Sequence, residues 1–244
     1  WSSLHRWRGL EGPFSAPAIR NALRLAIRAA DRPRARKSAS AITRDILDQL
    51  LATCGRGRAV DLRDRALLLL AFGSGGRRRS EIARLKLDDL ERREPVPADT
   101  ATPDGEALPV LAIRLRRTKT SSADAGESVL VVGRPVEALR AWLAYSTVDA
   151  GPVFRRIDKW GNIGAVALDP QSVNAMIKSR CAAAGLDPEQ FSAHGLRSGY
   201  LTEAARAGVP LPEAMQQSRH RSVQQAARYY NEGEITRGRA ARLA

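Results

Sequence analysis

Arginines, histidines and tyrosines gather in three short stretches of the sequence, and each stretch could bind or attack an anion. The first is GSGGRRRSEIARL at residues 73–85, where three arginines follow a glycine-rich break and open an expected helix. Backbone N–H groups at a helix start favour anions, and the guanidinium group contacts phosphate oxygens in bidentate fashion. An arginine run that is simply exposed to solvent is the alternative, and taken alone the stretch favours that interpretation.

The second stretch is FSAHGLRSGYLTEAARAGVP at residues 191–210. His194 and Arg197 are three positions apart, so on a helix they share one face, while Leu196, Leu201 and Ala204 would point toward the core. A histidine near a helix start is commonly a cap or a hydrogen-bonded core group. The arginine on the same face makes a functional pair somewhat more plausible.

The third stretch is QSRHRSVQQAARYYNEGE at residues 217–234, in which Tyr229 follows His220 by nine positions. On one straight helix nine residues span about 13 Å, so the two side chains could not touch. They can serve one site only if the chain bends between them, or if both face a ligand that spans this distance.

The order of these stretches, with a lysine between the first two, resembles the tyrosine recombinase (phage integrase) family. That family's pattern is Arg-x-Ser-Glu, a β-hairpin lysine, His-x-x-Arg, a His or Trp, and a tyrosine nine residues later. The matching residues here are Arg78 with Ser80 and Glu81, Lys119 in RRTKTSSADAG, His194, Arg197, His220 and Tyr229. The resemblance covers residues 38–244, and counting from His220 selects Tyr229 rather than Tyr230.

The sequence departs from the family's pattern at a few positions. Gly195 stands where serine or threonine is common, and Arg219 replaces the usual glycine before His220. Arg77 and Arg79 flank Arg78, so three arginines compete for the first motif, and the Ser-Glu spacing favours Arg78.

The resemblance implies a site-specific recombinase that cleaves and rejoins double-stranded DNA through a 3′-phosphotyrosyl intermediate. Tyr229 would attack the phosphorus, Arg78 and Arg197 would bind the non-bridging oxygens, and Lys119 would protonate the departing 5′-oxygen. His194 would hydrogen-bond the phosphate or accept the tyrosine proton, and His220 would add a donor. No cofactor, metal or ATP is expected, and protomers would assemble as a tetramer on two DNA sites.

Two other functions remain open. A type IB topoisomerase-like nicking and closing enzyme would use nearly the same catalytic groups. A non-catalytic DNA-binding protein would use its arginines only to contact phosphates, which leaves the order of the motifs unexplained.

Charge also favours a polyanionic partner. The 244 residues hold 40 Lys+Arg against 26 Asp+Glu, a formal net charge of +14. Neutralising phosphates releases condensed counterions and drives such binding. Only five of the cations are lysines, so a lysine that acts as a general acid must be Lys37, Lys86, Lys119, Lys159 or Lys178.

The sequence contains no signal-peptide pattern and no membrane-spanning run, and Cys54 and Cys181 are expected to be reduced thiols. These features predict a cytoplasmic protein, and the resemblance implies that it is bacterial or phage-encoded and associated with the nucleoid.

Hydrophobic periodicity predicts a mainly α fold with a small antiparallel β-sheet or hairpin, an α+β class. Strands are expected at 110–120 and 127–132, after a loop at 93–109, and 151–164 is expected to be irregular with Phe154 and Trp160 as core anchors. The expected helices cover residues 16–31, 42–54, 61–76, 79–87, 134–145, 170–184, 194–207, 211–218, 222–230 and 234–243.

The resemblance also predicts the domains. Residues 1–37 are expected to be the end of an N-terminal core-binding region plus a basic linker, and residues 38–244 a catalytic domain with a C-terminal tail. The tail carries Ile235, Ala240 and Leu243, which could dock on a neighbouring protomer or fold back on their own domain.

Overall fold

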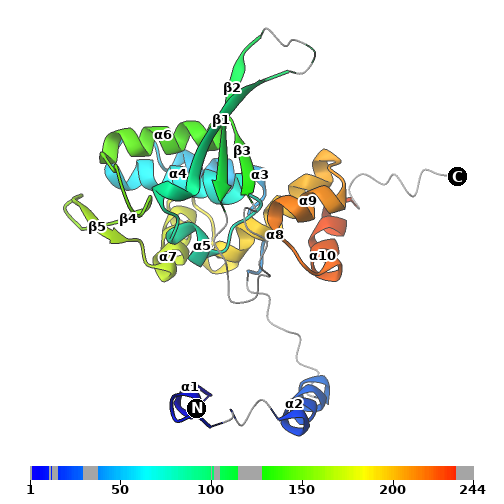
Figure 1. The fold of residues 1–244 in the computed structure, drawn as a ribbon. Helices are drawn as coiled ribbons and strands as arrows, with labels where there is room; N and C mark the ends of the chain where they lie inside the picture. Colours follow the sequence, from blue (N-terminus) through cyan, green and yellow to red (C-terminus); the bar gives the residue numbers. More distant parts are fainter. Residues whose placement is uncertain are drawn as a thin grey trace, which may run out of the picture. The chain divides into compact units, whose positions relative to one another are not determined.

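The computed structural model describes residues 2–10, 12, 16–29, 38–99, 101, 105–114 and 128–234. The chain divides into two units, Trp1–Arg36 and Lys37–Ala244. The first unit holds α1 (Ser2–Trp7) and α2 (Pro17–Ala29), and the second holds all other elements (Figure 1). The apolar stripe of α2, with Ile19, Leu23 and Ile27, is exposed in this structure. Within the described ranges, no helix combines the length and the apolar character needed to cross a bilayer.

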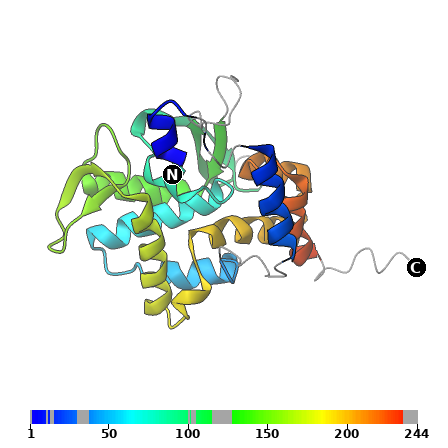
Figure 2. The same ribbon diagram turned by 90° about the horizontal axis from the view of Figure 1, so that it is seen from below.

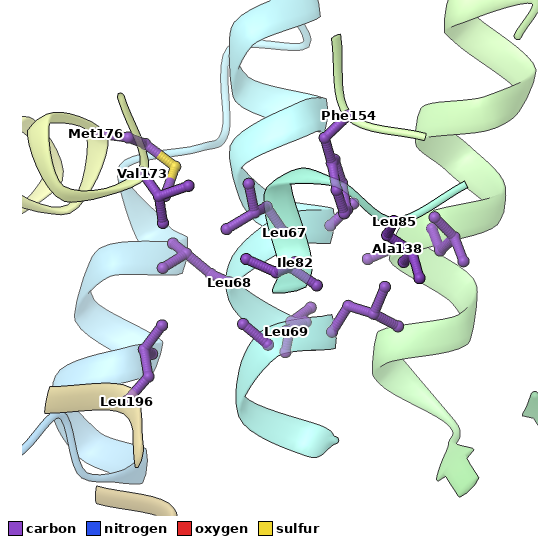
Figure 3. Packing of buried hydrophobic residues seen from close by; sticks show 14 of the residues in the cluster. Leu67, Leu68, Leu69, Ile82, Leu85, Ala138, Phe154, Val173, Met176 and Leu196 are labelled. Atoms are coloured by element: carbon purple, nitrogen blue, oxygen red, sulfur yellow. The ribbon is translucent and has the colours of Figure 1, made fainter. Parts of the chain in front are cut away.

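The core of the second unit is built around α4 (Ala59–Gly73). This helix is apolar on nearly every side, and its four successive leucines at 67–70 are buried. Four helices surround it: α3 (Arg44–Ala52), α6 (Arg134–Ser146), α7 (Pro170–Ala183) and α8 (Ala193–Ala207). Figure 3 shows Leu67, Leu68 and Leu69 of α4 among side chains of the neighbouring elements. A helix hydrophobic all round must be enclosed, as the sequence predicted for this segment. Thr43 precedes α3 as expected, but its side chain makes no capping hydrogen bond.

A three-stranded antiparallel sheet packs beside these helices, with strands β1 (Leu90–Pro97), β2 (Ala107–Arg114) and β3 (Ser128–Val132) in that order. The predicted loop at 93–109 is wrong at both ends, because residues 93–97 belong to β1 and residues 107–109 to β2. Strand β1 lies at the sheet edge, and a register shift between Arg93 and Val96 accommodates Pro95. Edge strands and bulges tolerate proline, and the exposure of β1 removes the alternation that would have indicated a strand.

A second hairpin, β4 (Arg155–Ile157) with β5 (Ile163–Ala167), replaces the irregular segment that we expected. Phe154 is fully buried, as predicted, but Trp160 is 76% exposed, so its prediction as a core anchor is wrong. The carboxylate of Asp158 accepts hydrogen bonds from the backbone N–H groups of Trp160 and Asn162 at 2.9 Å each. This polar turn closes the hairpin without apolar packing, which leaves the indole outside.

The helix predicted at 79–87 is shorter than expected, because α5 ends at Ala83 (Arg79–Ala83). The following residues pair with another segment: Leu85 O accepts from Val153 N at 2.9 Å, and Leu87 N donates to Gly151 O at 3.0 Å. A 3₁₀ turn, η2 (Leu87–Asp89), then leads into β1. A second 3₁₀ turn, η3 (Pro188–Gln190), precedes α8.

The helices α9 (Leu211–Ser218) and α10 (Val223–Glu234) pack with α8 around a second, smaller apolar cluster. Both views place α8 between the core helices and this pair (Figures 1 and 2). Leu196, Leu201 and Ala204 of α8 are buried, as the sequence predicted. The helix expected at 234–243, and the tail residues within it, lie outside the described residues apart from Glu234, the last residue of α10.

A buried ion network joins α7 to α4. Arg180 is 7% exposed, and its guanidinium lies 2.9 Å from Asp61 Oδ1 and 2.7 Å from Asp64 Oδ2. Arg58 also pairs with Asp61, and Arg63 with Asp64. Burial acts to lower the pKa of Arg180, but the two carboxylates outweigh it and raise the pKa above its usual value. The charge of Arg180 is therefore compensated inside the fold.

We expect Arg180→Met to lower the free energy of unfolding by about 3 kcal/mol, because two buried carboxylates lose a partner. The loss is at the lower end for such networks, since each carboxylate keeps one arginine. Urea denaturation followed by circular dichroism measures it. Lys178→Met on the same helix breaks only the exposed pair with Glu189 and should change the free energy by less than about 1 kcal/mol. Equal losses of unfolding free energy in the two variants would contradict the assignment of Arg180 to a buried ion network that stabilises the fold.

Candidate active site

Arg197 is the point at which three segments of the second unit meet. It lies on α8 and is 8% exposed. Its Nη1 donates to the carbonyl oxygen of Gly76 at 3.3 Å, and its Nε donates to Nε2 of His220 at 3.1 Å. The guanidinium thus connects α8 to the turn between α4 and α5 and to the loop between α9 and α10.

Two glycines allow these segments to approach. Gly75 and Gly76 have φ angles of +89° and +71°, a region that disfavours side chains. A Cβ atom on Gly76 would lie 2.2 Å from Cα of Arg197, and one on Gly75 would lie 2.4 Å from the carbonyl oxygen of Gln217. The glycine-rich break before the arginine run is therefore needed for backbone contact with α8 and α9.

The chain bends between His220 and Tyr229, so the separation expected along one straight helix does not apply. Arg219 ends α9 with a left-handed φ of 56°, and α10 begins only at Val223. His220 lies in this loop, with Nδ1 2.7 Å from Oγ of Ser218. Burial, followed by the charge of Arg197, lowers the pKa of His220 to about 3. The ring is therefore neutral at physiological pH.

The two neighbouring tyrosines have different environments. The hydroxyl of Tyr229 lies 3.1 Å from Nε2 of His194, and the two rings meet edge to face with centroids 6.0 Å apart. Tyr230 is only 6% exposed, and its hydroxyl donates to the carbonyl oxygen of Val209 at 2.5 Å. Thr202 holds the backbone by donating to the carbonyl oxygen of Tyr229 at 3.2 Å. Tyr229 thus faces the histidine, while Tyr230 anchors α10 to the smaller apolar cluster.

The three arginines of the first motif differ in exposure. Arg78 precedes α5, its side chain is 61% exposed, and its Nη1 lies 3.2 Å from Oε1 of Glu81. Arg77 is 5% exposed, and its Nη2 donates to the carbonyl oxygen of Gln217 at 2.7 Å. Arg79 and Ser80 are exposed. The motif therefore supplies one accessible and one buried guanidinium near the site.

Positive charge accumulates around Arg197 without a carboxylate bonded to it. Burial is the largest cause that lowers its pKa to about 10, and the charges of Arg77 and Arg78 come next. Burial also lowers the pKa of Arg77. Such a cluster is electrostatically unfavourable when empty and suits an oxyanion. Among the residues that the structure describes, no cluster of three or more His, Cys, Asp or Glu side chains could hold a metal ion.

Of the six predicted catalytic residues, the structure brings His194, Tyr229, Arg197 and His220 into two contacting pairs. Arg78 is close enough for its charge to lower the pKa values of both Arg197 and His220. Lys119 lies outside the described residues. The sequence did not predict that Arg77 is buried near the site, nor that Ser218 and Thr202 contact His220 and the backbone of Tyr229. The arginine run drew attention to Arg77, whereas no local pattern pointed to Ser218 or Thr202.

The sequence of this chain matches a known protein family and several curated relatives. Residues 40–234 match the model of the phage integrase family. The chain is 32% identical over 185 residues to the "Integrase/recombinase xerD homolog" of Selenomonas ruminantium, which covers 73% of this chain and 50% of that protein. It is 29% identical over 229 residues to "Recombinase cre" of Escherichia phage P1, covering 87% of this chain and 62% of that protein. The chain thus spans about half to two thirds of the length of these relatives.

Solved structures show the same fold. XerH site-specific recombinase bound to palindromic difH substrate matches with a TM-score of 0.60 at 19% identity, covering 85% of this chain and 54% of that chain. XerA recombinase matches with a TM-score of 0.58 at 19% identity, and the match covers 92% of this chain and 74% of that chain. The predicted fold class, mainly α with small antiparallel sheets, is confirmed.

Proposed function

The chain belongs to the phage integrase family, and from this membership we propose that it is a site-specific DNA recombinase that acts through a 3′-phosphotyrosyl intermediate on Tyr229. The observation that carries the proposal is the placement of the Tyr229 hydroxyl 3.1 Å from His194 Nε2, on the helix that also holds Arg197. A nucleophile, a base and a buried cation then share one site.

Tyr229 needs activation, because a free tyrosine has a pKa of about 10. His194 is positioned to accept the proton, because its Nε2 lies 3.1 Å from the Tyr229 hydroxyl. Attack on phosphorus expels the 5′-oxygen of the DNA strand and leaves a phosphotyrosyl ester. The ester conserves the energy of the broken bond, so a 5′-hydroxyl can later attack it and restore the strand.

Arg197 and Arg78 would bind the non-bridging oxygens and stabilise the added negative charge at five-coordinate phosphorus. His220 would add a donor to the phosphate. Lys119 would protonate the departing 5′-oxygen, a role that rests on its place in the motif. Ser80 and Glu81 would support the first arginine, and Glu81 does contact Arg78 in this structure.

The reaction as proposed uses neither metal nor ATP, because the leaving strand end is retained and the ester linkage is exchanged rather than hydrolysed. The partner is double-stranded DNA, which fits the formal net charge of +14. XerH, which shares the fold, was solved with its difH substrate. Protomers would assemble as a tetramer on two sites, in the cytoplasm of a bacterium and on its DNA or that of a phage.

A suicide DNA substrate, nicked so that the cleaved end diffuses away, tests the proposal on candidate attachment sites. We expect a covalent protein–DNA adduct that forms in EDTA without ATP and maps to a defined position. Relaxation of any supercoiled plasmid without site preference would instead indicate a topoisomerase-like enzyme. Salt-sensitive binding to random DNA without any adduct would indicate a non-catalytic DNA-binding protein.

A further inference from the structure

His220 is held by one side chain on each ring nitrogen. On one side, Nε of Arg197 lies 3.1 Å from Nε2, and on the other, Oγ of Ser218 lies 2.7 Å from Nδ1. Ser218 is the last residue of α9 and is completely buried. Both ring positions are therefore occupied by partners whose hydrogen-bonding abilities differ.

Those abilities determine where the ring proton lies. The guanidinium group only donates hydrogen bonds, so Nε2 of His220 must offer a lone pair to Arg197. The ring is neutral and carries one N–H, which must then be on Nδ1. Nδ1–H therefore donates to Oγ of Ser218. The hydroxyl hydrogen of Ser218 is left to point at the carbonyl oxygen of Met215, 3.5 Å away.

We propose that Ser218 is a positioning residue that acts together with Arg197. In the DNA-free protein Arg197 donates to Nε2 of His220 and the hydroxyl of Ser218 accepts from Nδ1, which holds the ring as the Nδ1–H tautomer. When a phosphate binds, the same hydroxyl donates to Nδ1 of the other tautomer. The change of tautomer on phosphate binding rests on the proposed function, whereas the tautomer of the DNA-free protein does not. In the DNA-free protein, His220 is an acceptor that occupies Nε of Arg197.

Phosphate binding reverses the direction of the hydrogen bonds. When a phosphate oxygen takes Nε–H of Arg197, Nε2 of His220 loses its donor and faces an anion. The ring proton then leaves Nδ1 for solvent while solvent supplies one to Nε2, so the ring stays neutral and no net proton is taken up. Nε2–H donates to the phosphate oxygen, and the hydroxyl of Ser218 rotates to donate to Nδ1. A hydroxyl can make both arrangements because it donates and accepts.

Nitrogen NMR of the full chain tests the tautomer directly. The chain contains only three histidines, so long-range proton–nitrogen spectra of ¹⁵N-labelled protein contain three sets of ring signals. His5→Gln and His194→Gln identify two sets by their loss. We expect Nε2 of His220 to show the shift of an unprotonated ring nitrogen, and Nδ1 that of a protonated one. The opposite pattern in the wild-type protein overturns the proposal, whatever the variants do.

Ser218→Ala removes the partner of Nδ1, and we expect the preference for the Nδ1–H tautomer to fall roughly tenfold, since a buried donor is left unsatisfied. Ser218→Thr keeps the hydroxyl and should restore the wild-type signals. Ser198→Ala is the matched control: Ser198 is also buried, but its hydroxyl donates to the carbonyl oxygen of Gly195 at 3.2 Å. The His220 signals should be unchanged in this variant.

Single-turnover attachment to the suicide substrate separates this proposal from the proposed function. We expect Ser218→Ala to slow attachment roughly tenfold at unchanged DNA affinity, and Ser218→Thr to recover the rate. A His220 tautomer that ignores Ser218→Ala overturns the positioning role even if the wild-type protein attaches to DNA. The predicted tautomer in a protein that attaches to no DNA would retain the positioning role and refute the recombinase.

Discussion

Tyr229→Phe is expected to abolish covalent attachment to a suicide DNA substrate while leaving DNA affinity unchanged within about twofold. The phenol oxygen is the atom that would bond to phosphorus, and no other group in the site can replace it. The ring itself is retained, so its edge-to-face contact with His194 persists. Gel electrophoresis under denaturing conditions detects the adduct, and a gel shift measures affinity. An adduct of wild-type yield would show that another residue is the nucleophile.

Tyr230→Phe is the matched control, because it removes a hydroxyl from the adjacent residue. In the wild-type protein the hydroxyl of Tyr230 donates to the carbonyl oxygen of Val209, in the apolar cluster between α8, α9 and α10. Losing that bond should lower the free energy of unfolding by about 1 kcal/mol and leave attachment detectable. If Tyr230→Phe abolished the adduct and Tyr229→Phe did not, the nucleophile would move by one residue.

The elements that the sequence predicted well are those with a strong local pattern. The buried helix α4 was evident from its unbroken apolar composition, and the inward positions of α8 followed from helical spacing. Strand β1 was missed because an exposed edge strand with two prolines carries no alternation. Trp160 was misjudged because a polar turn around Asp158 closes its hairpin.

The candidate site depended on contacts that residue types do not encode. His220 meets Arg197 because Arg219 adopts a left-handed conformation and ends α9 there, a conformation that arginine rarely takes. Likewise, three successive arginines are indistinguishable in the sequence. Arg77 is the buried one, and its guanidinium donates to the Gln217 carbonyl, 140 positions away in the sequence. Ordered motifs thus predicted which residues to examine, and tertiary contacts determined how they are arranged.

Arg180 and Arg197 are almost equally buried, and they differ in whether carboxylates lie beside the guanidinium. Their exposed fractions are 7% and 8%, so desolvation disfavours both charges. The pKa of Arg180 is nevertheless raised by Asp64 and Asp61, whereas that of Arg197 is lowered to about 10 by burial and by Arg77 and Arg78. A base whose pKa is lowered by folding holds its proton less tightly in the folded protein than in the unfolded chain, so the cost of its charge is fully present at every pH below the lowered pKa. At neutral pH the charge of Arg197 therefore destabilises the folded protein.

Arg197→Met is accordingly expected to affect activity and stability in opposite senses. Attachment should slow by at least about 10³-fold, because the phosphate loses its most buried cationic donor. The free energy of unfolding should be no lower than in the wild-type protein, since removing the charge relieves desolvation and repulsion that offset the lost bonds to Gly76 and His220. Single-turnover attachment and urea denaturation measure the two effects, with Arg180→Met as the variant that loses stability. Destabilisation of Arg197→Met as large as that of Arg180→Met would mean that Arg197 is a structural group, and attachment at the wild-type rate would remove it from the phosphate site.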